Sequence, residues 1–425
     1  MTRSSVLLSR LWFALVVLRF VGSAGDVAAK VVDSTRTPIQ VILNPTTTPA
    51  TSVALTWRTE GPAPDQAVQF AVATPGTSFT AQAISVPARS ETAILDTRAE
   101  GYYHSVVLSG LKPATRYLYR VGSEAGWTEW NQVLTAQTVP APFTFVYFGD
   151  PQDGLKEHVT RIFRTADLLA PDAAFWLIAG DLTSEPEDAQ IRDFFTAGGA
   201  AFRNRLVVPV AGNHDIAFLY DEAGNIVLNK KGKKQRGEEL PPTWRAQFTL
   251  PENGVAGLEE SNYHLDYQGV RLIVLNSNVR LADQAAWLEP RLATHPNRWT
   301  IVCFHHPLYS AGRDRDDRTT RDAFLPLFDK YRVDLVLTGH DHAYARSRPL
   351  RGSVAVPAGE HGTVYVVSSC GSKFYPVTPV NPDLMAKTAG DLQLCQKISI
   401  DGDRLRYVSV AADGSVNDAF ELQKK

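Results

Sequence analysis

Five apolar segments, each followed at once by residues that can bind metal ions, constrain the fold of this chain more than any other feature. The segments have the length and composition of buried strands and span residues 143–148, 174–179, 206–211, 299–304 and 333–337. They lead in turn into Gly149-Asp150, Gly180-Asp181, Gly212-Asn213-His214-Asp215, His305-His306-Pro307 and Gly339-His340-Asp341-His342. Because the carboxyl ends of strands in an α/β sheet meet at one edge, these side chains can converge on one crevice.

The side chains at these positions predict a centre for two metal ions. Carboxylates, one amide and imidazoles together suit two adjacent divalent or trivalent ions of intermediate hardness. A bridging carboxylate holds two ions about 3.5–4 Å apart, the spacing used for in-line displacement at phosphorus. His340 and His342 lie two positions apart, so on an extended or turn segment both can face one cluster.

The segments between and before these motifs predict two domains. Apolar residues recur at helical spacing between the strands, which indicates a layered α/β domain with helices covering its sheets. Residues 37–138 instead contain short alternating runs separated by turn residues, the pattern of a small antiparallel β-sandwich. The stiff stretch Val139-Pro140-Ala141-Pro142 separates this sandwich from the α/β domain, residues 143–425.

One motif in the first domain resembles the tyrosine corner of fibronectin type III domains. It is Leu111-Lys112-Pro113-Ala114-Thr115-Arg116-Tyr117. Tyr117 is also explained as a core aromatic residue, and both interpretations agree with a β-sandwich.

The amino-terminal residues predict export. Arg3 and Arg10 precede an apolar run, residues 11–18, and small residues follow, so residues 1–29 read as a signal peptide cleaved after Ala24 or Ala29. The apolar run is much shorter than the ~20 residues that a membrane-spanning helix needs. We therefore expect a secreted or periplasmic protein without a membrane span.

Net charge, cysteine content and one basic run bear on the partners and on disulfide formation. The formal net charge of −2 gives no support for nucleic acid as the main partner. Cys370 and Cys395 can pair in an oxidising compartment or remain buried free thiols. The basic run at residues 230–236 either attracts anionic substrates or forms a solvated loop balanced by Glu238 and Glu239. Nothing in the sequence indicates an oligomeric state.

In this order, the five motifs resemble the calcineurin-like metallophosphoesterase superfamily, and within it the purple acid phosphatases, over residues 37–425. The resemblance implies an α/β/β/α catalytic sandwich behind the β-sandwich. It implies that Asp181 bridges the two ions. The other ligands that it implies are Asp150 and His342 on the first ion and Asn213, His305 and His340 on the second.

The resemblance also implies roles for residues around the ions. His214 contacts the phosphate and protonates the leaving oxygen, and Asp215 orients the ring of His214. His306 and Arg313 lie in a segment expected to form the substrate rim, where an arginine suits phosphate.

Two positions depart from the purple acid phosphatase pattern. The tyrosine that gives those enzymes their colour is replaced by Ser184, which predicts a colourless enzyme active with divalent zinc, manganese or iron at neutral to mildly alkaline pH. Gln152 stands where other metallophosphoesterases carry a metal-binding histidine. It either supplies an amide oxygen to the first ion or is a turn residue with a water molecule in its place.

The function that these features indicate is hydrolysis of small phosphate monoesters by a hydroxide held between two metal ions. One alternative is a phosphodiesterase acting on nucleotides or glycerophosphodiesters, because the same core serves both reactions. Another is a non-catalytic extracellular binding protein that uses its sandwich for adhesion. The complete set of ligands argues against this last alternative.

Overall fold

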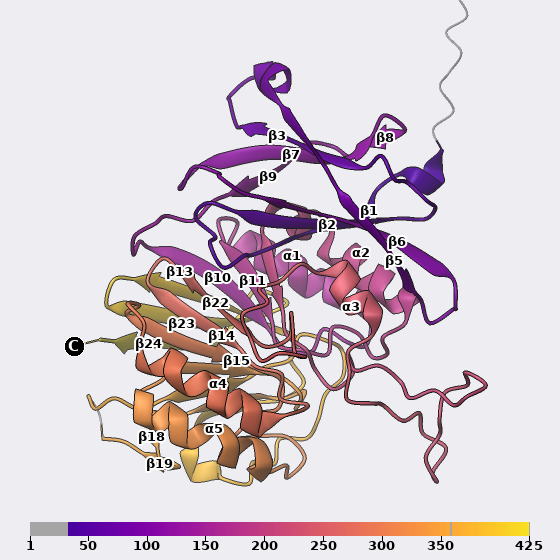
Figure 1. Cartoon of the computed structure of the whole chain (residues 1–425). Helices are drawn as coiled ribbons and strands as arrows, with labels where there is room; N and C mark the ends of the chain where they lie inside the picture. The colour runs from indigo at the N-terminus through magenta and orange to yellow at the C-terminus, as the bar shows by residue number, and fades with distance from the viewer. Residues whose placement is uncertain (1–32, 358, 425) are drawn as a thin grey trace, which may run out of the picture. The chain divides into compact units, whose positions relative to one another are not determined.

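The computed structural model of the chain describes residues 33–357 and 359–424 (Figure 1). The predicted signal peptide, residues 1–29, lies outside the described residues. Among the helices of residues 33–424, none combines the length and the apolar content needed to cross a bilayer.

The first part of the chain is all-β. Strands β1, β2, β6 and β5 lie side by side in one sheet, and β4, β3, β7 and β8 form a second sheet in which β9 pairs with β7. Buried side chains of both sheets, such as Trp57 and Tyr119, contribute to the hydrophobic core. The strands are β1 (Ile39–Asn44), β2 (Val53–Thr59), β3 (Ala67–Val72), β4 (Ile84–Pro87), β5 (Arg89–Ile94), β6 (Glu100–Leu108), β7 (Arg116–Ser123), β8 (Gly126–Trp127) and β9 (Asn131–Leu134).

The tyrosine-corner motif forms the hydrogen bond that defines it. The backbone N–H of Lys112 donates to the hydroxyl oxygen of Tyr117 at 2.9 Å. Tyr117 is also buried in the core, so both sequence interpretations of this residue describe it correctly.

The second part of the chain is an α/β domain. Its helices are α1 (Thr160–Leu169), α2 (Asp188–Asn204), α3 (Pro242–Gln247), α4 (Leu281–Ala293) and α5 (Arg318–Tyr331). Its strands are β10 (Phe143–Phe148), β11 (Phe175–Ile178), β12 (Leu206–Pro209), β13 (Tyr263–Tyr267), β14 (Val270–Val274), β15 (Trp299–Cys303), β16 (Leu335–Thr338), β17 (Tyr344–Ser347), β18 (Leu350–Arg351), β19 (Val354–Ala355), β20 (Val364–Val367), β21 (Met385–Ala389), β22 (Leu394–Asp401), β23 (Arg404–Ala411) and β24 (Val416–Gln423).

Two sheets carry the five ligand motifs. In the first sheet β10, β11 and β12 are parallel neighbours, and β22, β23 and β24 continue it on one side. In the second sheet the order is β13-β14-β15-β16-β20-β17-β21, with β14, β15, β16 and β20 parallel to one another. The motifs therefore follow three neighbouring strands of one sheet and two neighbouring strands of the other.

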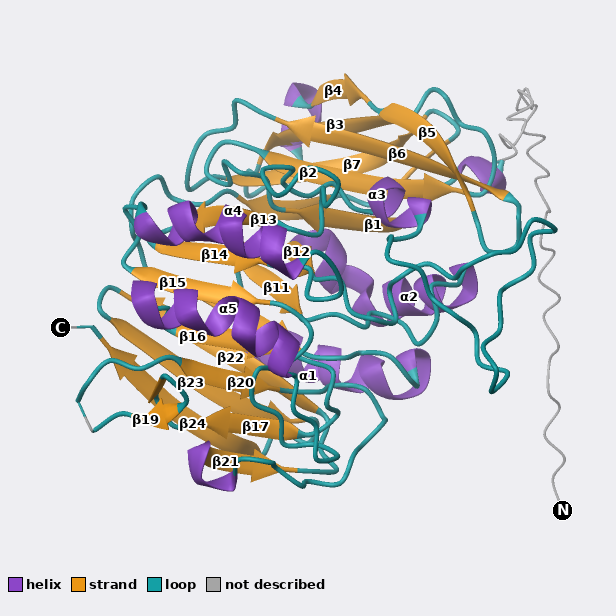
Figure 2. Cartoon of the chain, turned by 60° about the horizontal axis from the view of Figure 1, so that its bottom comes forward, coloured by secondary structure: helices purple, strands orange, loops and turns teal. Residues whose placement is uncertain are grey.

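The alternation of side chains along the strands creates the layers. In β15, Ile301 and Cys303 belong to the large core that includes the first sheet, whereas Val302 packs in a separate core with residues of α4 and α5. Figure 2 shows α4 and α5 lying along one face of the second sheet. On the first sheet, Phe148 packs against Phe163 of α1, with ring centroids 4.8 Å apart. The order helix, sheet, sheet, helix is the predicted α/β/β/α sandwich.

The cysteines are buried free thiols. Cys303, Cys370 and Cys395 are all buried and unpaired, so Cys370 and Cys395 do not form a disulfide in this structure. Burial raises the pKa of the Cys395 thiol to about 12 and that of the Cys370 thiol well above its ordinary value. Both therefore stay protonated at neutral pH.

The first sheet continues from the α/β domain into the β-sandwich. Strand β1 pairs in parallel with β12, with Leu43 opposite Leu206, so ten strands form one sheet. The fully buried side chain of Asn44 joins three segments there: its Nδ2 donates to the carbonyl of Val207 at 2.8 Å, and its Oδ1 accepts from the backbone N–H of Thr249 at 3.2 Å. The shared sheet and the contacts of Asn44 couple the β-sandwich to the α/β domain. The domain boundaries 37–138 and 143–425 stay a prediction.

Replacing the side chain at this junction should destabilise the whole molecule. Asn44→Ala removes the side-chain partner of the buried Val207 carbonyl and of the half-buried Thr249 N–H, which costs about 1–3 kcal/mol in total. Urea unfolding followed by fluorescence should show one transition, shifted to lower urea. The control Asn417→Ala loses one long 3.5 Å contact and should change the free energy of unfolding by less than about 0.5 kcal/mol. Two separate transitions, or an effect of Asn44→Ala no larger than the control's, would contradict the coupling.

Candidate metal centre

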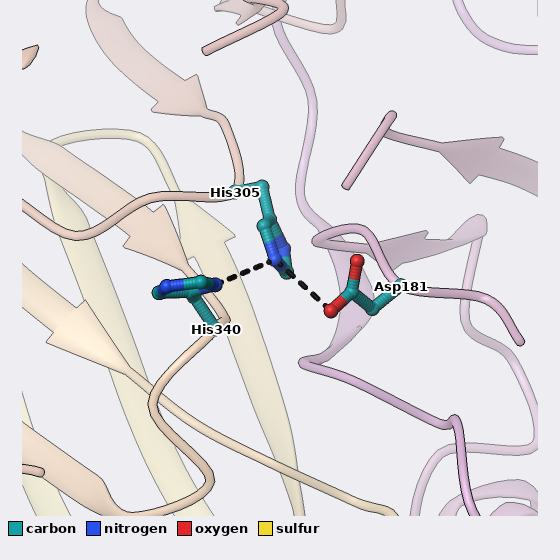
Figure 3. A group of neighbouring side chains, drawn as sticks. All are labelled: Asp181, His305 and His340. Atoms are coloured by element: carbon teal, nitrogen blue, oxygen red, sulfur yellow. Dashed lines mark hydrogen bonds and ion pairs between the residues drawn. The ribbon is translucent and has the colours of Figure 1, made fainter. Parts of the chain in front are cut away.

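The predicted metal ligands meet where the strands of the two sheets end. Asp150, Asp181, His305 and His342 are at most 2% exposed, and Asn213 and His340 are half-buried. Figure 3 shows Asp181, His305 and His340 pointing toward one another from three separate segments. One ligand atom from each of these three lies within 4.8 Å of the other two. The structure thus brings together residues that are up to 159 positions apart in the sequence.

His305 shows most clearly that a cation fits this cluster. Its Nδ1 donates to the carbonyl of Ala179 at 2.8 Å, so in the neutral ring Nε2 is the unprotonated nitrogen and carries a free lone pair. That Nε2 lies 3.1 Å from Asn213 Oδ1, 3.2 Å from His340 Nδ1 and 3.2 Å from Asp181 Oδ2. One proton cannot satisfy so many acceptors, whereas one metal ion can bind all four atoms. A backbone carbonyl on the far nitrogen is also the usual support of a metal-binding histidine.

A second group of ligand atoms lies beside the first. Asp150 Oδ2 accepts from the backbone N–H of His340 at 2.6 Å, and within the described residues its Oδ1 has no hydrogen-bond partner. The amide nitrogen of Gln152 lies 2.9 Å from Asp181 Oδ2 and 3.1 Å from His342 Nε2. Its amide oxygen is buried and has no hydrogen-bond partner in the part of the chain that the structure describes. Turning this amide by 180° directs its oxygen toward the same two side chains. The donor set fits a first ion held by Asp150, Asp181, Gln152 and His342.

Glycine is required next to the ligands because the segments approach closely. At Gly180, where φ is +88°, a Cβ atom would lie 2.5 Å from the Nδ1 of His305. At Gly212 a Cβ atom would lie 2.3 Å from Asp181 Oδ1. These contacts explain the Gly-Asp and Gly-Asn-His patterns, since any larger residue would push the ligands apart.

Four of the predicted ligands adopt backbone conformations that L-residues seldom take. The φ angles are +41° at Asp150, +51° at Asp181, +75° at His340 and +43° at His342. Such conformations cost about 1–3 kcal/mol each and cluster at functional sites. Here they turn the chain sharply after each strand and direct the ligands into the crevice.

Burial and mutual charge strongly perturb the ionisation of this cluster. Burial lowers the pKa of His305, but the carboxylates of Asp181 and Asp150 outweigh burial and raise it to about 10. Burial, followed by the charge on His305, lowers the pKa of His340. Burial also raises the pKa of Asp150 well above its ordinary value. The two carboxylates therefore favour positive charge at the position of His305 Nε2.

The ring of His214 is oriented differently from the prediction. Its Nδ1 donates to the carbonyl of Ser184 at 2.5 Å, and its backbone N–H donates to Asp181 Oδ1 at 2.7 Å. The carboxylate of Asp215 instead accepts from the backbone N–H groups of Gly212 at 2.8 Å and Leu182 at 3.1 Å. The prediction that Asp215 orients the ring is wrong: Asp215 ties two ligand loops together, and a backbone carbonyl holds the imidazole.

Arg236 is a part of the site that the sequence did not reveal. Its Nη1 donates to the carbonyls of His214 at 2.8 Å and Ile216 at 2.7 Å, and its Nη2 donates to the carbonyl of Ser184 at 3.1 Å. Lys234 pairs with Glu187 at 3.1 Å rather than with the acidic residues that follow the run. The lysines of the run are exposed, as the solvated-loop interpretation expects, whereas Arg236 folds inward. The sequence of the basic run does not show which of its residues folds inward, because all of them carry the same kind of charge.

The two predicted rim residues contact different neighbours of the predicted ligands. His306 contacts Ser277 Oγ through Nδ1 at 2.9 Å, its ring lies 4.5 Å from that of His340, and burial lowers its pKa to about 4. The guanidinium of Arg313 stacks on Tyr375 at 3.7 Å from the ring centroid. Both side chains are thus beside the candidate centre.

Two protein-family models match the chain. The model described as the N-terminal domain of purple acid phosphatase matches residues 38–135, and the model described as calcineurin-like phosphoesterase matches residues 143–344. The chain is a purple acid phosphatase-like member of the metallophosphoesterase superfamily. This confirms the resemblance that the five motifs indicate.

Individual relatives and solved structures agree with this assignment. An uncharacterized protein of Mycobacterium tuberculosis is 30% identical over 287 residues, which is 58% of this chain and 51% of that protein. The chain thus spans about half the length of the first curated relatives that it matches. Human acid phosphatase type 7 is 27% identical over 405 residues, 86% of this chain and 84% of that protein. A purple acid phosphatase from yellow lupin seeds shares the fold with a TM-score of 0.74 at 19% identity, covering 91% of this chain and 74% of that chain.

The amide of Gln152 can be tested as a ligand. If its oxygen binds the first ion, Gln152→Ala should weaken the affinity for that ion by at least about tenfold and leave the other unchanged. Gln152→His should restore binding, because histidine occupies this position in other metallophosphoesterases. Metal content after dialysis against graded chelator measures both, with the exposed Gln132→Ala as control. Equal metal retention by Gln152→Ala and wild type would favour the interpretation as a turn residue.

Proposed function

We propose that this protein is an exported phosphatase that hydrolyses phosphate monoesters of small molecules with the help of two metal ions. The observation that carries the proposal is the convergence of His305 Nε2, Asp181 Oδ2, Asn213 Oδ1 and His340 Nδ1 on one point, with Asp150, Gln152 and His342 beside it. Relatives named as acid phosphatases support the reaction class. Export rests on the amino-terminal sequence pattern, and nucleic acid is not proposed as a main partner.

Two bound metal ions would supply charge neutralisation for the phosphate and would make water a stronger nucleophile. Asp181 suits the bridging position, since its Oδ2 faces both His305 and the Gln152 amide. Asp150 and His342 complete the first site, and Asn213 with His340 completes the second. No side chain has to form a covalent intermediate in this arrangement.

His214 is the proposed acid for the leaving group. Because its Nδ1–H is held by the carbonyl of Ser184, the Nε2 atom remains to carry a proton to the ester oxygen. Arg236 holds that carbonyl and the carbonyl of His214 itself, which fixes the ring relative to the ligands. His306, with Nδ1 engaged by Ser277, can present an Nε2–H group to a phosphate oxygen.

Substitution of His214 tests both the reaction class and the acid. Metal-loaded wild-type protein should hydrolyse glycerol 3-phosphate with a higher kcat/KM than bis(p-nitrophenyl) phosphate. His214→Ala should keep its metals and lower kcat on glycerol 3-phosphate by about 10²–10⁴-fold. The loss should be smaller on p-nitrophenyl phosphate, whose leaving group needs little protonation.

The exposed His158→Ala serves as the matched control and should behave as wild type. Equal losses on both monoesters would remove the acid role and leave His214 as a phosphate contact only. A wild-type preference for the diester would overturn the monoester assignment in favour of a phosphodiesterase.

A further inference from the structure

Three cationic side chains surround one tyrosine next to the metal ligands. The guanidinium of Arg313 lies 3.7 Å from the centroid of the Tyr375 ring, that of Arg315 lies 5.1 Å from it, and the ammonium group of Lys373 lies 5.7 Å from it. We call these four residues the cationic rim. They come from two loops, one after β15 and one after β20.

The cationic rim is attached directly to the segment that carries two ligands. The ring of Tyr375 packs against that of His342 with centroids 4.8 Å apart, and its backbone N–H donates to the His342 carbonyl at 3.1 Å. Arg315 donates to the carbonyl of His340 at 3.1 Å. The cationic rim is therefore adjacent to the segment that carries His340 and His342.

Backbone contacts fix the position of the two loops. Gly312 pairs with Val377 in an antiparallel bridge, and the N–H of Arg313 donates to the carbonyl of Pro376 at 3.3 Å. Arg313 and the next residue, Asp314, have φ angles of +57° and +53°. Unfavourable conformations at two successive residues indicate that the surrounding contacts hold this turn, which presents Arg313 over the ring.

The positive charge of the cationic rim is only partly balanced. Arg315 pairs with Asp341 Oδ1 at 3.2 Å, and Lys373 lies 3.7 Å from Asp153 Oδ2. Arg313 is exposed, and among residues 33–357 and 359–424 no carboxylate lies within ion-pair distance of its guanidinium. Its five N–H donors are therefore free to bind an anion while its plane rests on Tyr375.

We infer that the cationic rim binds a second anionic group of the substrate, so that the preferred substrates are phosphate esters with another phosphate or a carboxylate on the leaving-group side. This inference rests on the proposed phosphatase function. The hydrolysed phosphate occupies the metal centre, and the second group lies between Arg313 and Lys373. Because that group is bound equally before and during the reaction, the preference should appear in KM rather than in kcat.

Two matched substrate pairs test this with the metal-loaded full chain. The pairs are fructose 1,6-bisphosphate with fructose 6-phosphate, and 3-phosphoglycerate with glycerol 3-phosphate. Wild type should show a kcat/KM about tenfold higher for the member with the second anionic group, as a charge-assisted contact provides. Arg313→Gln should reduce this ratio by about threefold or more, mainly by raising KM, since Lys373 remains. Arg318→Gln, an exposed arginine paired with Asp316 nearby, should keep the wild-type ratio.

The outcomes separate this inference from the function on which it rests. If wild type hydrolyses none of the four esters, the proposed function fails. If it hydrolyses them without preference, or if Arg313→Gln keeps the preference, the cationic rim is not the binding site, although the phosphatase stands. A preference in the bisphosphate pair alone would support the site and identify the second group as a phosphate. A preference in both pairs would support a site for either anion.

Discussion

The whole site depends on one electrostatic constraint: lone pairs of several buried ligand atoms point at one another across about 3 Å. His305 Nε2 faces Asn213 Oδ1, His340 Nδ1 and Asp181 Oδ2, and its far nitrogen is already engaged by a backbone carbonyl. Such an arrangement is unfavourable unless positive charge lies among the atoms. The carboxylates of Asp181 and Asp150 raise the pKa of His305, so both favour positive charge at this position. Metal ions are the natural occupants.

The fold holds these ligand atoms close together despite their mutual repulsion. Strands of two sheets end at the same crevice, glycines let His305 and Asp181 approach neighbouring backbone, and four ligands accept left-handed φ angles. The large core beneath them is continuous with the β-sandwich through the pairing of β1 with β12. The ligand-bearing strands are thus packed into a core that extends across both parts of the described chain. The loops around the crevice, which carry Arg236 and Arg313, remain the parts that can vary to select a substrate.

Local patterns in the sequence predict the strands that carry the predicted ligands. They do not predict contacts between residues that are far apart in the sequence. Residues 143–148 form β10 as expected, because an uninterrupted apolar run before Gly149-Asp150 permits little else. The role of Ser184 could not be predicted, since its backbone carbonyl, which every residue has, holds His214. Arg236 and Tyr375 act through partners 22 and 33 residues away, and neither lies in a motif. The pairing of Leu43 with Leu206 likewise leaves no local trace.

The most direct test of the central claim is a metal titration of the metal-free chain, with bound ions and hydrolysis of glycerol 3-phosphate measured together. Zinc or manganese should bind at two ions per chain, and activity should rise until the second equivalent is bound. Asp181→Asn should bind about one ion or fewer and should be inactive, because a neutral amide is a poor bridge between two cations. The exposed Asp283→Asn should match wild type. Full activity with a single ion, or two ions and normal turnover in Asp181→Asn, would contradict the account.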